Sequence, residues 1–278
     1  TRGEPIPRIL YIDLSNPEQL SLKLQDGDSI FIDRISGQVQ NPVEFVGALS
    51  RPAIYAWFEG ARFSDYVTDV DADLLPNTDL DIGLVVRRKN DELDIEVLPF
   101  DVLDAIQNAG QAADPILEAH DKVIIFGLPT VTRGKALASP KMEDDASSKI
   151  LPSRTELLEP IIERLKDQAD LREMVALVGI GGAVRVPGEY PLLRGGTVES
   201  LIELAGGLTD GAFVKSLEIR RIDSVPGFTA SVELIQMSLE DLTERDSGFT
   251  LRSRDFVQVH HVSDWNPSDV IVLEGEVV

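Results

Sequence analysis

The sequence predicts an α+β protein with tandem small domains, each a mixed β-sheet with one main helix. Three observations predict this architecture. A Gly-x-x-x-x-Pro-x-x-Tyr head occurs twice, at residues 47–55 and 182–190. A Leu-x-x-x-Asp tail with alternating β-branched residues closes each copy, at residues 117–125 and 251–259. Between head and tail lie one helical pattern and further strand patterns. A repeated module favours binding or assembly over a single catalytic centre.

The length of the repeat follows from partial copies at both ends of the chain. A further tail at 24–32 places Asp28 93 residues before Asp121, and a further head places Gly275 93 residues after Gly182. The two complete tails are 134 residues apart, so about 41 extra residues separate the two units. We therefore expect these segments: 1–36, the tail of a preceding repeat or of another domain; 37–129, a first, degenerate domain; 130–172, a linker plus helix; 173–264, a second domain; and 265–278, the start of a further repeat.

The insertion between the units has two parts. Residues 133–148 are polar and typical of a flexible linker. The second part predicts an amphipathic helix that Ser153 or Thr155 caps. The helix packs on its own domain or forms a strut to a neighbouring subunit. Its apolar positions are Leu157, Leu158, Ile161, Ile162 and Leu165.

The elements of the second unit are predicted in chain order. Residues 175–185 form a strand whose glycines indicate a bulge or a close backbone approach. Residues 186–189, Val-Pro-Gly-Glu, fit a type II turn. Thr197 caps a helix whose apolar stripe is Val198, Leu201, Ile202 and Ala205. Gly206-Gly207 ends this helix by accepting a left-handed conformation. The remaining strands are 216–222, 228–237 and 257–262.

The first unit follows the same plan with a weaker motif. Residues 63–70 are the predicted helix and residues 82–88 the predicted strand, which ends in Arg87-Arg88 as its counterpart ends in Arg220-Arg221. Ala53 replaces the glycine of the turn, and residues 72–75 replace the Ala-Gly-Gly-Leu segment at 205–208.

Composition excludes several classes of protein. The net charge is −22, which argues against nucleic acid and against unaided binding to anionic lipid. The chain has no cysteine, so it has no disulfide, zinc-thiolate site or cysteine nucleophile. No apolar run approaches the roughly 20 residues of a membrane helix. The chain begins at Thr1 rather than Met, so we expect a piece of a longer or processed protein.

The head at 182–192, the helix at 198–202, Ala-Gly-Gly-Leu at 205–208 and the Leu-x-x-x-Asp-x-Val-x-Val tail together resemble the SLBB repeat, the soluble-ligand-binding β-grasp domain. Tandem repeats of this kind resemble the outer-membrane polysaccharide export proteins of the Wza type. The resemblance implies periplasmic β-grasp domains that assemble into rings around the path of a capsule polysaccharide or exopolysaccharide. It also implies a polysaccharide ligand and an inner-membrane polysaccharide co-polymerase as partner. Under this resemblance, residues 1–36 are the tail of a preceding repeat or of the export domain of the family.

Three places in the sequence carry residue types that bind metals. Residues 69–73, Asp-Val-Asp-Ala-Asp, begin like a calcium loop, but the glycine and glutamate that the loop requires are replaced by Leu74 and Leu80. We expect a solvated loop after a helix there. His260 and His261 are neighbours on a strand and point to opposite faces, so without a bulge they cannot share a metal. His120 lies in a turn before a strand. We expect no metal and no cofactor.

Catalysis is not expected either. Pairs of carboxylates cleave glycosides at separations of about 5–9.5 Å, but among 48 acidic residues chance pairs are certain. The Gly-Ile-Gly-Gly segment at 179–182 is not followed by a helix, so it lacks the context of a dinucleotide site.

Four residues at the module heads are the candidates for contact with polymer or partner: Tyr55, Trp57, Arg185 and Tyr190. Sugar recognition commonly uses aromatic faces with polar or charged neighbours. The alternative is that both tyrosines pack structurally against their sheets. Trp265 lies in a connector and is expected to wedge between consecutive modules.

Three functions remain open. The first is a non-enzymatic periplasmic scaffold for polysaccharide export. The second is a soluble ligand-binding module of another envelope process, and the third is a carboxylate-dependent hydrolase of exopolysaccharide.

Overall fold

The structure, a computed structural model, describes residues 41–90, 93–128, 152–169, 174–223, 231–239 and 249–262. The expected tail at 1–36, the polar linker at 133–148 and the start of a further repeat at 265–278, with Trp265, lie outside the described residues. The first unit is residues 41–128 and the second unit is residues 174–262. The bounds of their elements follow.

The first unit contains β1 (Pro42–Gly47), β2 (Ala53–Ala56), the 3₁₀ helix η2 (Phe63–Asp65), α1 (Val70–Asp73), β3 (Thr78–Arg88), β4 (Ile95–Phe100), α2 (Val102–Gln107) and β5 (Lys122–Gly127). The helix α3 (Arg154–Asp167) lies between the units in sequence. The second unit contains β6 (Leu177–Gly182), β7 (Gly188–Pro191), α4 (Val198–Leu204), β8 (Ala212–Asp223), β9 (Ser231–Met237) and β10 (Phe256–His261).

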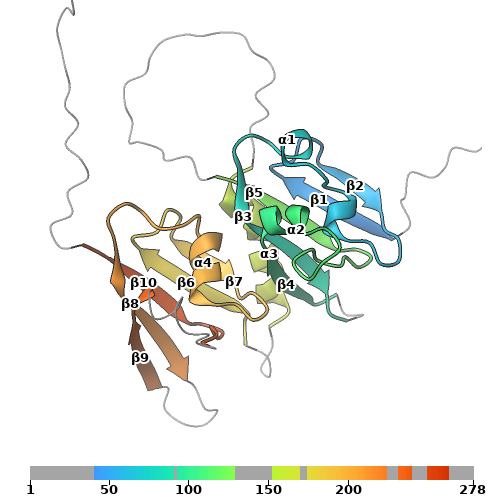
Figure 1. Ribbon diagram of the computed structural model, residues 1–278. Coiled ribbons are helices and arrows are strands. Elements are labelled where there is room, and N and C mark those ends of the chain that lie inside the picture. The colour runs from blue at the N-terminus through green and yellow to red at the C-terminus, as the bar shows by residue number, and fades with distance from the viewer. Residues whose placement is uncertain are drawn as a thin grey trace, which may run out of the picture. The chain divides into compact units, whose positions relative to one another are not determined.

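The two units have the same sheet topology (Figure 1). The strand order is β2-β1-β5-β3-β4 in the first sheet and β7-β6-β10-β8-β9 in the second. The first strand of each unit pairs in parallel with the last, β1 with β5 and β6 with β10, and the other pairs are antiparallel. The predicted α+β architecture of tandem mixed sheets is confirmed.

A glycine ends the first strand of each unit because no larger residue fits there. Gly47 has φ +101° and Gly182 has φ +84°, conformations that residues with a Cβ rarely adopt. A Cβ on Gly47 would also collide with the carbonyl oxygen of Ile125, and one on Gly182 with that of Val259. The same carbonyl oxygens accept hydrogen bonds from the N–H groups of the next residues, at 2.8 Å and 2.9 Å. The head glycine thus lets the chain leave the first strand tight against the last strand.

A buried ion pair joins the arginine of the third strand to the aspartate of the tail in both units. Arg87 Nη2 lies 2.6 Å from Asp121 Oδ2, and Arg221 Nη2 lies 2.7 Å from Asp255 Oδ2. The aspartate side chains are 1% and 0% exposed. Each arginine also donates to the carbonyl oxygen five residues before its aspartate, at 2.8 Å and 3.2 Å. Each aspartate accepts from the N–H three residues before it, at 2.7 Å and 2.8 Å.

These contacts correct the sequence alignment of the two units by one residue. Arg87 is the counterpart of Arg221, because each lies 34 residues before its aspartate. The sequence comparison had paired Arg87 with Arg220. The counterpart of the Ala-Gly-Gly-Leu segment in the first unit likewise shifts by one residue. Leu74 forms a β-bridge with Leu49, as Leu208 does with Val184, so Leu74 rather than Leu75 corresponds to Leu208.

The helix of the second unit matches its prediction. Thr197 caps α4 by accepting from the N–H of Ser200 at 3.2 Å. The predicted stripe of Val198, Leu201, Ile202 and Ala205 is at most 7% exposed. Gly206 and Gly207 follow with φ of +80° and +90°, as the predicted helix end requires.

The helix predicted at 63–70 in the first unit is wrong. The chain forms the 3₁₀ turn η2, and then a separate four-residue helix, α1. Asp69 caps α1 by accepting from the N–H of Ala72, so the segment after Asp69 starts a new helix. The Asp69–Asp73 segment, expected to be a loop, is therefore this short helix with its cap.

The type II turn predicted at 186–189 is also wrong. Such a turn needs a positive φ at Gly188, and Gly188 does not have one. Instead, Arg185 N–H donates to Gly207 O and Val186 N–H donates to Ala205 O, both at 3.0 Å. The connection from β6 to β7 is therefore held by the end of α4 rather than by its own turn.

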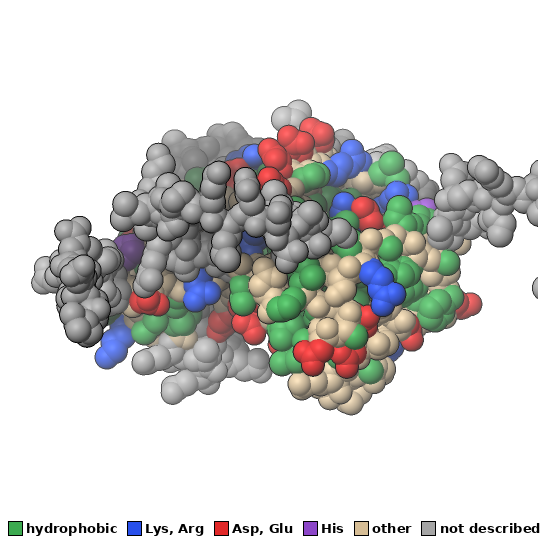
Figure 2. Space-filling view, turned by 90° about the horizontal axis from the view of Figure 1, so that it is seen from above, with side chains coloured by type: hydrophobic (Ala, Val, Ile, Leu, Met, Phe, Trp, Pro, Cys, Tyr) green, Lys and Arg blue, Asp and Glu red, His purple; other side chains and the backbone are tan. Residues whose placement is uncertain are grey.

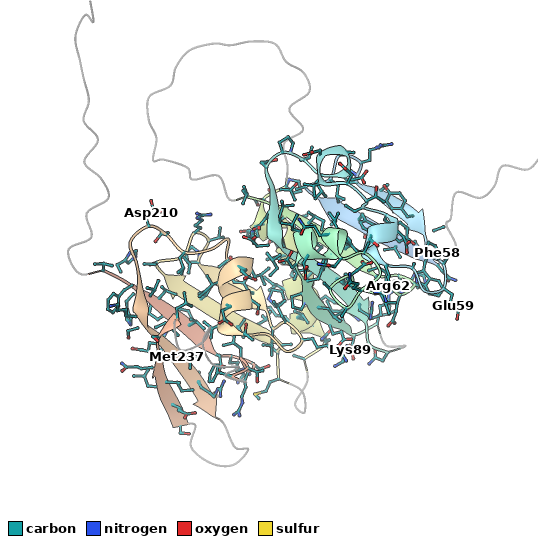
Figure 3. All side chains as sticks on the ribbon, in the orientation of Figure 1. Phe58, Glu59, Arg62, Lys89, Asp210 and Met237 are labelled. Carbon is teal, nitrogen blue, oxygen red and sulfur yellow. The ribbon has the colours of Figure 1, made fainter. Side chains whose placement is uncertain are left out.

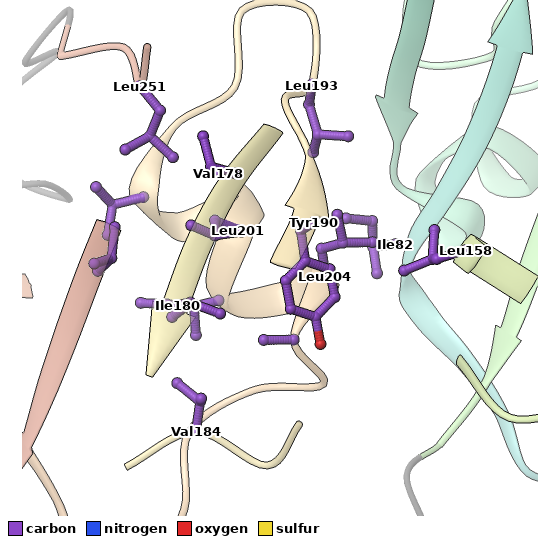
Figure 4. Close-up of a cluster of buried hydrophobic side chains, with 14 of the residues drawn as sticks. Ile82, Leu158, Val178, Ile180, Val184, Tyr190, Leu193, Leu201, Leu204 and Leu251 are labelled. Atoms are coloured by element: carbon purple, nitrogen blue, oxygen red, sulfur yellow. The ribbon is translucent and has the colours of Figure 1, made fainter. Parts of the chain in front are cut away.

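α3 packs on both units. Ser153 and Glu156 form the capping box of this helix. Its buried residues lie in a hydrophobic cluster with residues of both sheets, and Figure 4 shows Leu158 and Ile82 with Tyr190 and Leu204. The apolar face of α3 therefore packs within the chain and does not form a strut to a neighbouring subunit. It packs against both units, whereas the sequence predicts packing on one domain.

Polar contacts reinforce this junction. The buried Arg154 guanidinium pairs with Asp79 of β3 and donates to the carbonyl oxygens of Glu203 and Leu204 in α4, at 3.0 Å and 2.9 Å. Gln168 accepts from the N–H of Ile95 at 2.9 Å and donates to its carbonyl oxygen at 3.0 Å. One arginine thus ties α3, β3 and α4 together.

The described surface carries charges of both signs. On the face in Figure 2, acidic and hydrophobic side chains are interspersed with separate basic ones. In the part of the chain that the structure describes, no helix has the length and apolarity needed to cross a membrane.

We predict that Gly182→Ala destabilises the protein by about 1–3 kcal/mol from backbone strain, before the collision with Val259 O is added. Gly188→Ala is the control, because a Cβ there meets nothing within 4 Å. Urea unfolding should show little change for this control. Equal losses in the two variants would contradict the role of the head glycine.

We predict that Asp255→Ala costs about 3–5 kcal/mol, because it leaves the Arg221 guanidinium buried without its carboxylate. Lys166→Ala, which removes the exposed pair with Glu189, should cost about 0–1 kcal/mol. Denaturant unfolding measures both, and a loss at Asp255 no larger than that at Lys166 would refute the prediction.

Candidate functional site

The two candidate tyrosines occupy equivalent places, as the third of the four residues in the edge strand that follows each head. The Tyr190 hydroxyl donates to Val186 O at 2.5 Å, and the Tyr55 hydroxyl donates to Arg51 O at 3.2 Å. Tyr190 is 3% exposed, and burial raises the pKa of its hydroxyl to about 12. Tyr55 is half-buried. Each tyrosine therefore closes the loop before it, and Tyr55 also lines a pocket.

The other two candidates lie apart from each other. Trp57, half-buried in the first unit, donates from Nε1 to Leu117 O at 2.7 Å. Arg185, exposed in the second unit, donates to Gly206 O at 3.2 Å. The four candidates thus divide between the units, and a binding role for them stays a prediction.

The pocket beside Tyr55 is a better-defined candidate site. We call it the aromatic pocket. Its volume is about 200 Å³, below the 300–1,000 Å³ typical of sites for drug-sized ligands. Its residues come from β1, the loop before β2, β2 itself and the segment from η2 to α1. They are Phe45, Leu49, Arg51, Tyr55, Tyr66, Val67 and Asp73.

Three of the residues that line this pocket are aromatic, and their rings contact one another. The Tyr55 and Tyr66 ring centroids are 5.5 Å apart, and each ring also contacts Phe45, at 5.4 Å and 5.2 Å. The Tyr66 hydroxyl donates to Ala56 O at 2.9 Å, which fixes its ring. Burial raises the pKa of this hydroxyl, and the Asp65 charge adds to the effect. The ring centroid of Phe58 lies 6.1 Å from that of Tyr66, so Phe58 extends the group of aromatic rings to the surface (Figure 3).

Opposite charges stand at the polar end of the pocket. Asp73 Oδ2 accepts from the N–H and Oγ1 of Thr68 and from the N–H of Asp69, at 2.9 Å, 3.1 Å and 3.2 Å. The backbone hydrogen bond from Thr68 is the main reason that the pKa of Asp73 lies below its usual value. Arg51 is exposed, and within the described residues its guanidinium has no hydrogen bond or ion pair.

The second unit lacks the polar groups of this pocket. Ser50 N–H donates to Asp73 O as Arg185 N–H donates to Gly207 O, so Gly207 takes the place of Asp73. Counted from the head glycines, Val186 takes the place of Arg51. The charged pair is therefore particular to the first unit, where the motif is degenerate.

Sequence reasoning found part of this site. Tyr55 was a candidate for binding. Asp73 was considered only as a calcium ligand, and among the described residues no group of three or more His, Asp or Glu could hold a metal. Tyr66 was not predicted as a site residue, because the sequence predicts one continuous helix at 63–70 and the actual break brings Tyr66 to β2. Arg51 was not predicted either.

A group of acidic residues from both units surrounds Glu203. Glu203 on α4 has its pKa raised to about 7, mainly by burial and then by Asp81, Asp101 and Asp79, with Glu199 adding to the effect. Asp79 is the carboxylate that pairs with Arg154. We call this group the acidic junction.

Comparison with known proteins identifies the second unit. Residues 177–227 match the model of the SLBB domain, so the chain contains an SLBB domain. A search of curated proteins gave no match.

We predict that Glu203→Gln stabilises the protein at neutral and alkaline pH. The folded-state pKa of about 7 lies above the usual glutamate value of 4.5, so protonation favours the folded state and this stability is lost as pH rises through 7. Because Glu203 is partly exposed, screening limits the gain to about 1 kcal/mol or less, roughly 2–4 °C in Tm.

Thermal unfolding at about pH 5 and about pH 8 tests this prediction. The gain should be larger at the higher pH. Glu163→Gln, exposed on α3, is the control and should show no such pH dependence. A gain that is equal at both pH values would contradict the raised pKa.

Proposed function

We propose that this chain is a non-enzymatic, periplasmic segment of a capsule or exopolysaccharide export protein. It forms or lines an oligomeric channel, and it works with an inner-membrane polysaccharide co-polymerase. The observation that carries the proposal is the SLBB domain at 177–227, preceded by a unit of identical sheet topology. A chain that repeats one module in tandem is suited to building an extended assembly.

The firm connection between the units supports a scaffold. Hydrophobic side chains of both units and α3 share one cluster, and Arg154 binds elements of both. Domains joined by buried contacts keep a fixed orientation, whereas small polar interfaces permit relative motion. A channel wall requires such fixed spacing.

The use of the acidic residues supports a non-enzymatic role. Asp121 and Asp255 are buried in ion pairs with arginine, and Asp69 and Asp101 cap α1 and α2. A glycosidase needs two carboxylates free to act on one bond. These four instead hold the fold.

An exposed apolar surface supports assembly. Ile222 of β8 and Val232 and Leu234 of β9 are 41%, 65% and 53% exposed. Val232 lies directly opposite Ile222, and β9 is an edge strand of its sheet. Exposed apolar residues on an edge strand are typical of contact surfaces between proteins. In the export protein this surface would contact a neighbouring subunit.

The alternative function is a soluble ligand-binding module of the cell envelope outside any channel. The aromatic pocket is the observation that favours it, because a shaped pocket with charged groups suits a small ligand. Both functions use binding rather than catalysis.

The test is a deletion strain complemented with the full-length protein. We expect deletion to abolish polymer at the cell surface and the wild-type gene to restore it. Leu234→Glu should fail to restore it and should reduce the oligomer seen by light scattering of the purified full-length protein. Ile116→Glu, at a residue 53% exposed in the first unit, is the control and should restore export.

Two outcomes would contradict the export proposal. Normal surface polymer in the deletion strain would remove it. A full-length protein that stays monomeric and binds one small molecule tightly would favour the alternative. Shortening of purified polymer during incubation with the protein would overturn the non-enzymatic assignment.

A further inference from the structure

We propose that the aromatic pocket of the first unit binds a single neutral hexopyranose residue. Tyr55, Tyr66, Arg51 and Asp73 line the site, and Phe58 lies beside it against the Tyr66 ring. Its position and shape rest on geometry alone, while the choice of a carbohydrate as ligand rests in part on the proposed export function.

The walls suit the apolar face of a sugar ring. The face of an aromatic ring carries a negative quadrupole, which attracts the polarised C–H groups of a pyranose. Tyr55 and Tyr66 both use their hydroxyl hydrogens on backbone carbonyls, so their orientation is fixed before a ligand arrives. A fixed orientation lowers the entropic cost of binding.

The polar end suits hydroxyl groups. Three hydrogen bonds from Thr68 and Asp69 occupy Asp73 Oδ2, and no described group donates to Oδ1. An ionised carboxylate oxygen is a strong acceptor for a sugar hydroxyl. The Arg51 guanidinium offers donors to the oxygen of a neighbouring hydroxyl. An acceptor and a donor that line the same pocket suit two vicinal hydroxyls.

Charge favours a neutral sugar over a uronic acid. Arg51 and Asp73 carry opposite charges, and Arg51 lies close enough to lower the pKa of Asp73. The pocket therefore has little net charge of its own. The chain as a whole carries a net charge of −22, which repels an anionic ligand at long range.

The size favours one ring at a time. A pocket of about 200 Å³ is smaller than the usual site for a drug-sized ligand. Phe58, 51% exposed and in contact with the Tyr66 ring, lies beside the pocket and can stack a second ring of the same chain. The site would thus hold one residue of a polymer and steady the next.

The first experiment titrates the purified chain with the methyl glycosides of glucose, galactose and mannose, followed by amide chemical shifts. At least one glycoside should cause saturable shifts at Tyr66, Val67 and Asp73 in the millimolar range. Arg51→Ala should weaken that binding roughly tenfold, which corresponds to about 1.4 kcal/mol. Arg88→Ala, an exposed arginine on β3 outside the pocket, should leave it unchanged.

The second experiment examines Phe58. Phe58→Ala should weaken binding of the corresponding disaccharide and leave binding of the methyl glycoside unchanged. Ile54→Ala is the control, since Ile54 is 60% exposed on β2 and does not line the pocket.

Absence of saturable shifts with all three glycosides would overturn the site, as would equal losses in the Arg51 and Arg88 variants. These results are separate from the test of export. A strain that lacks surface polymer, with a protein that binds no hexoside, contradicts only this site. Hexoside binding with normal export in the deletion strain contradicts only the export function.

Discussion

The rest of each unit depends on one buried ion pair between the third strand and the tail. Arg221 is buried with Asp255, and the aspartate also accepts the N–H of Arg252, so the turn before β10 is fixed at its start. That turn sets the register of β10 against β6, with Val257 opposite Ile180. Because the register places Val259 O beside Gly182, the path of the head follows from it as well. A buried pair is costly to desolvate and adds little net stability compared with apolar residues. Its recurrence with the same geometry in both units fits a role in specifying the fold.

The same framework is used in two different ways. In the first unit, both faces of the sheet are covered. Val43 and Phe45 pack on one side with its own short helices, while Ile82 and Ile124 on the other join the cluster shared with α3 and the second unit. In the second unit, the strands β8 and β9 leave apolar residues exposed. Because the internal frame stays the same while its faces vary, one module forms a fixed joint in one copy and exposes apolar residues in the next, where we propose a contact with a neighbouring subunit.

How well the sequence predicts each feature depends on how local its cause is. The end of α4 at Gly206 was predictable, because only glycine readily takes its positive φ. The cap at Ser153 was also predictable, because it needs only residues within one turn. The break in the helix predicted at 63–70 also has a local signal, because Asp69 caps α1 through the N–H of Ala72, three residues later. The link between Arg87 and Asp121 was not predictable, because strand pairing rather than proximity in sequence brings them together.

The candidate site lies in the first unit, where the motif is degenerate, and there is a physical reason for this. In the second unit, α4 is continuous, and its end at Ala205 and Gly207 holds the head loop through two backbone hydrogen bonds. In the first unit, Asp73 replaces the second glycine and belongs to a separate short helix, so a carboxylate stands where the second unit has no side chain. The broken helix also brings the Tyr66 ring against Tyr55. Where the first unit departs from the repeat motif, glycine is no longer required at the end of the helix. The residues that replace the motif supply aromatic and charged groups of the kind that a binding site needs. In a tandem array, the copy that fits its motif poorly is therefore the better place to look for a ligand.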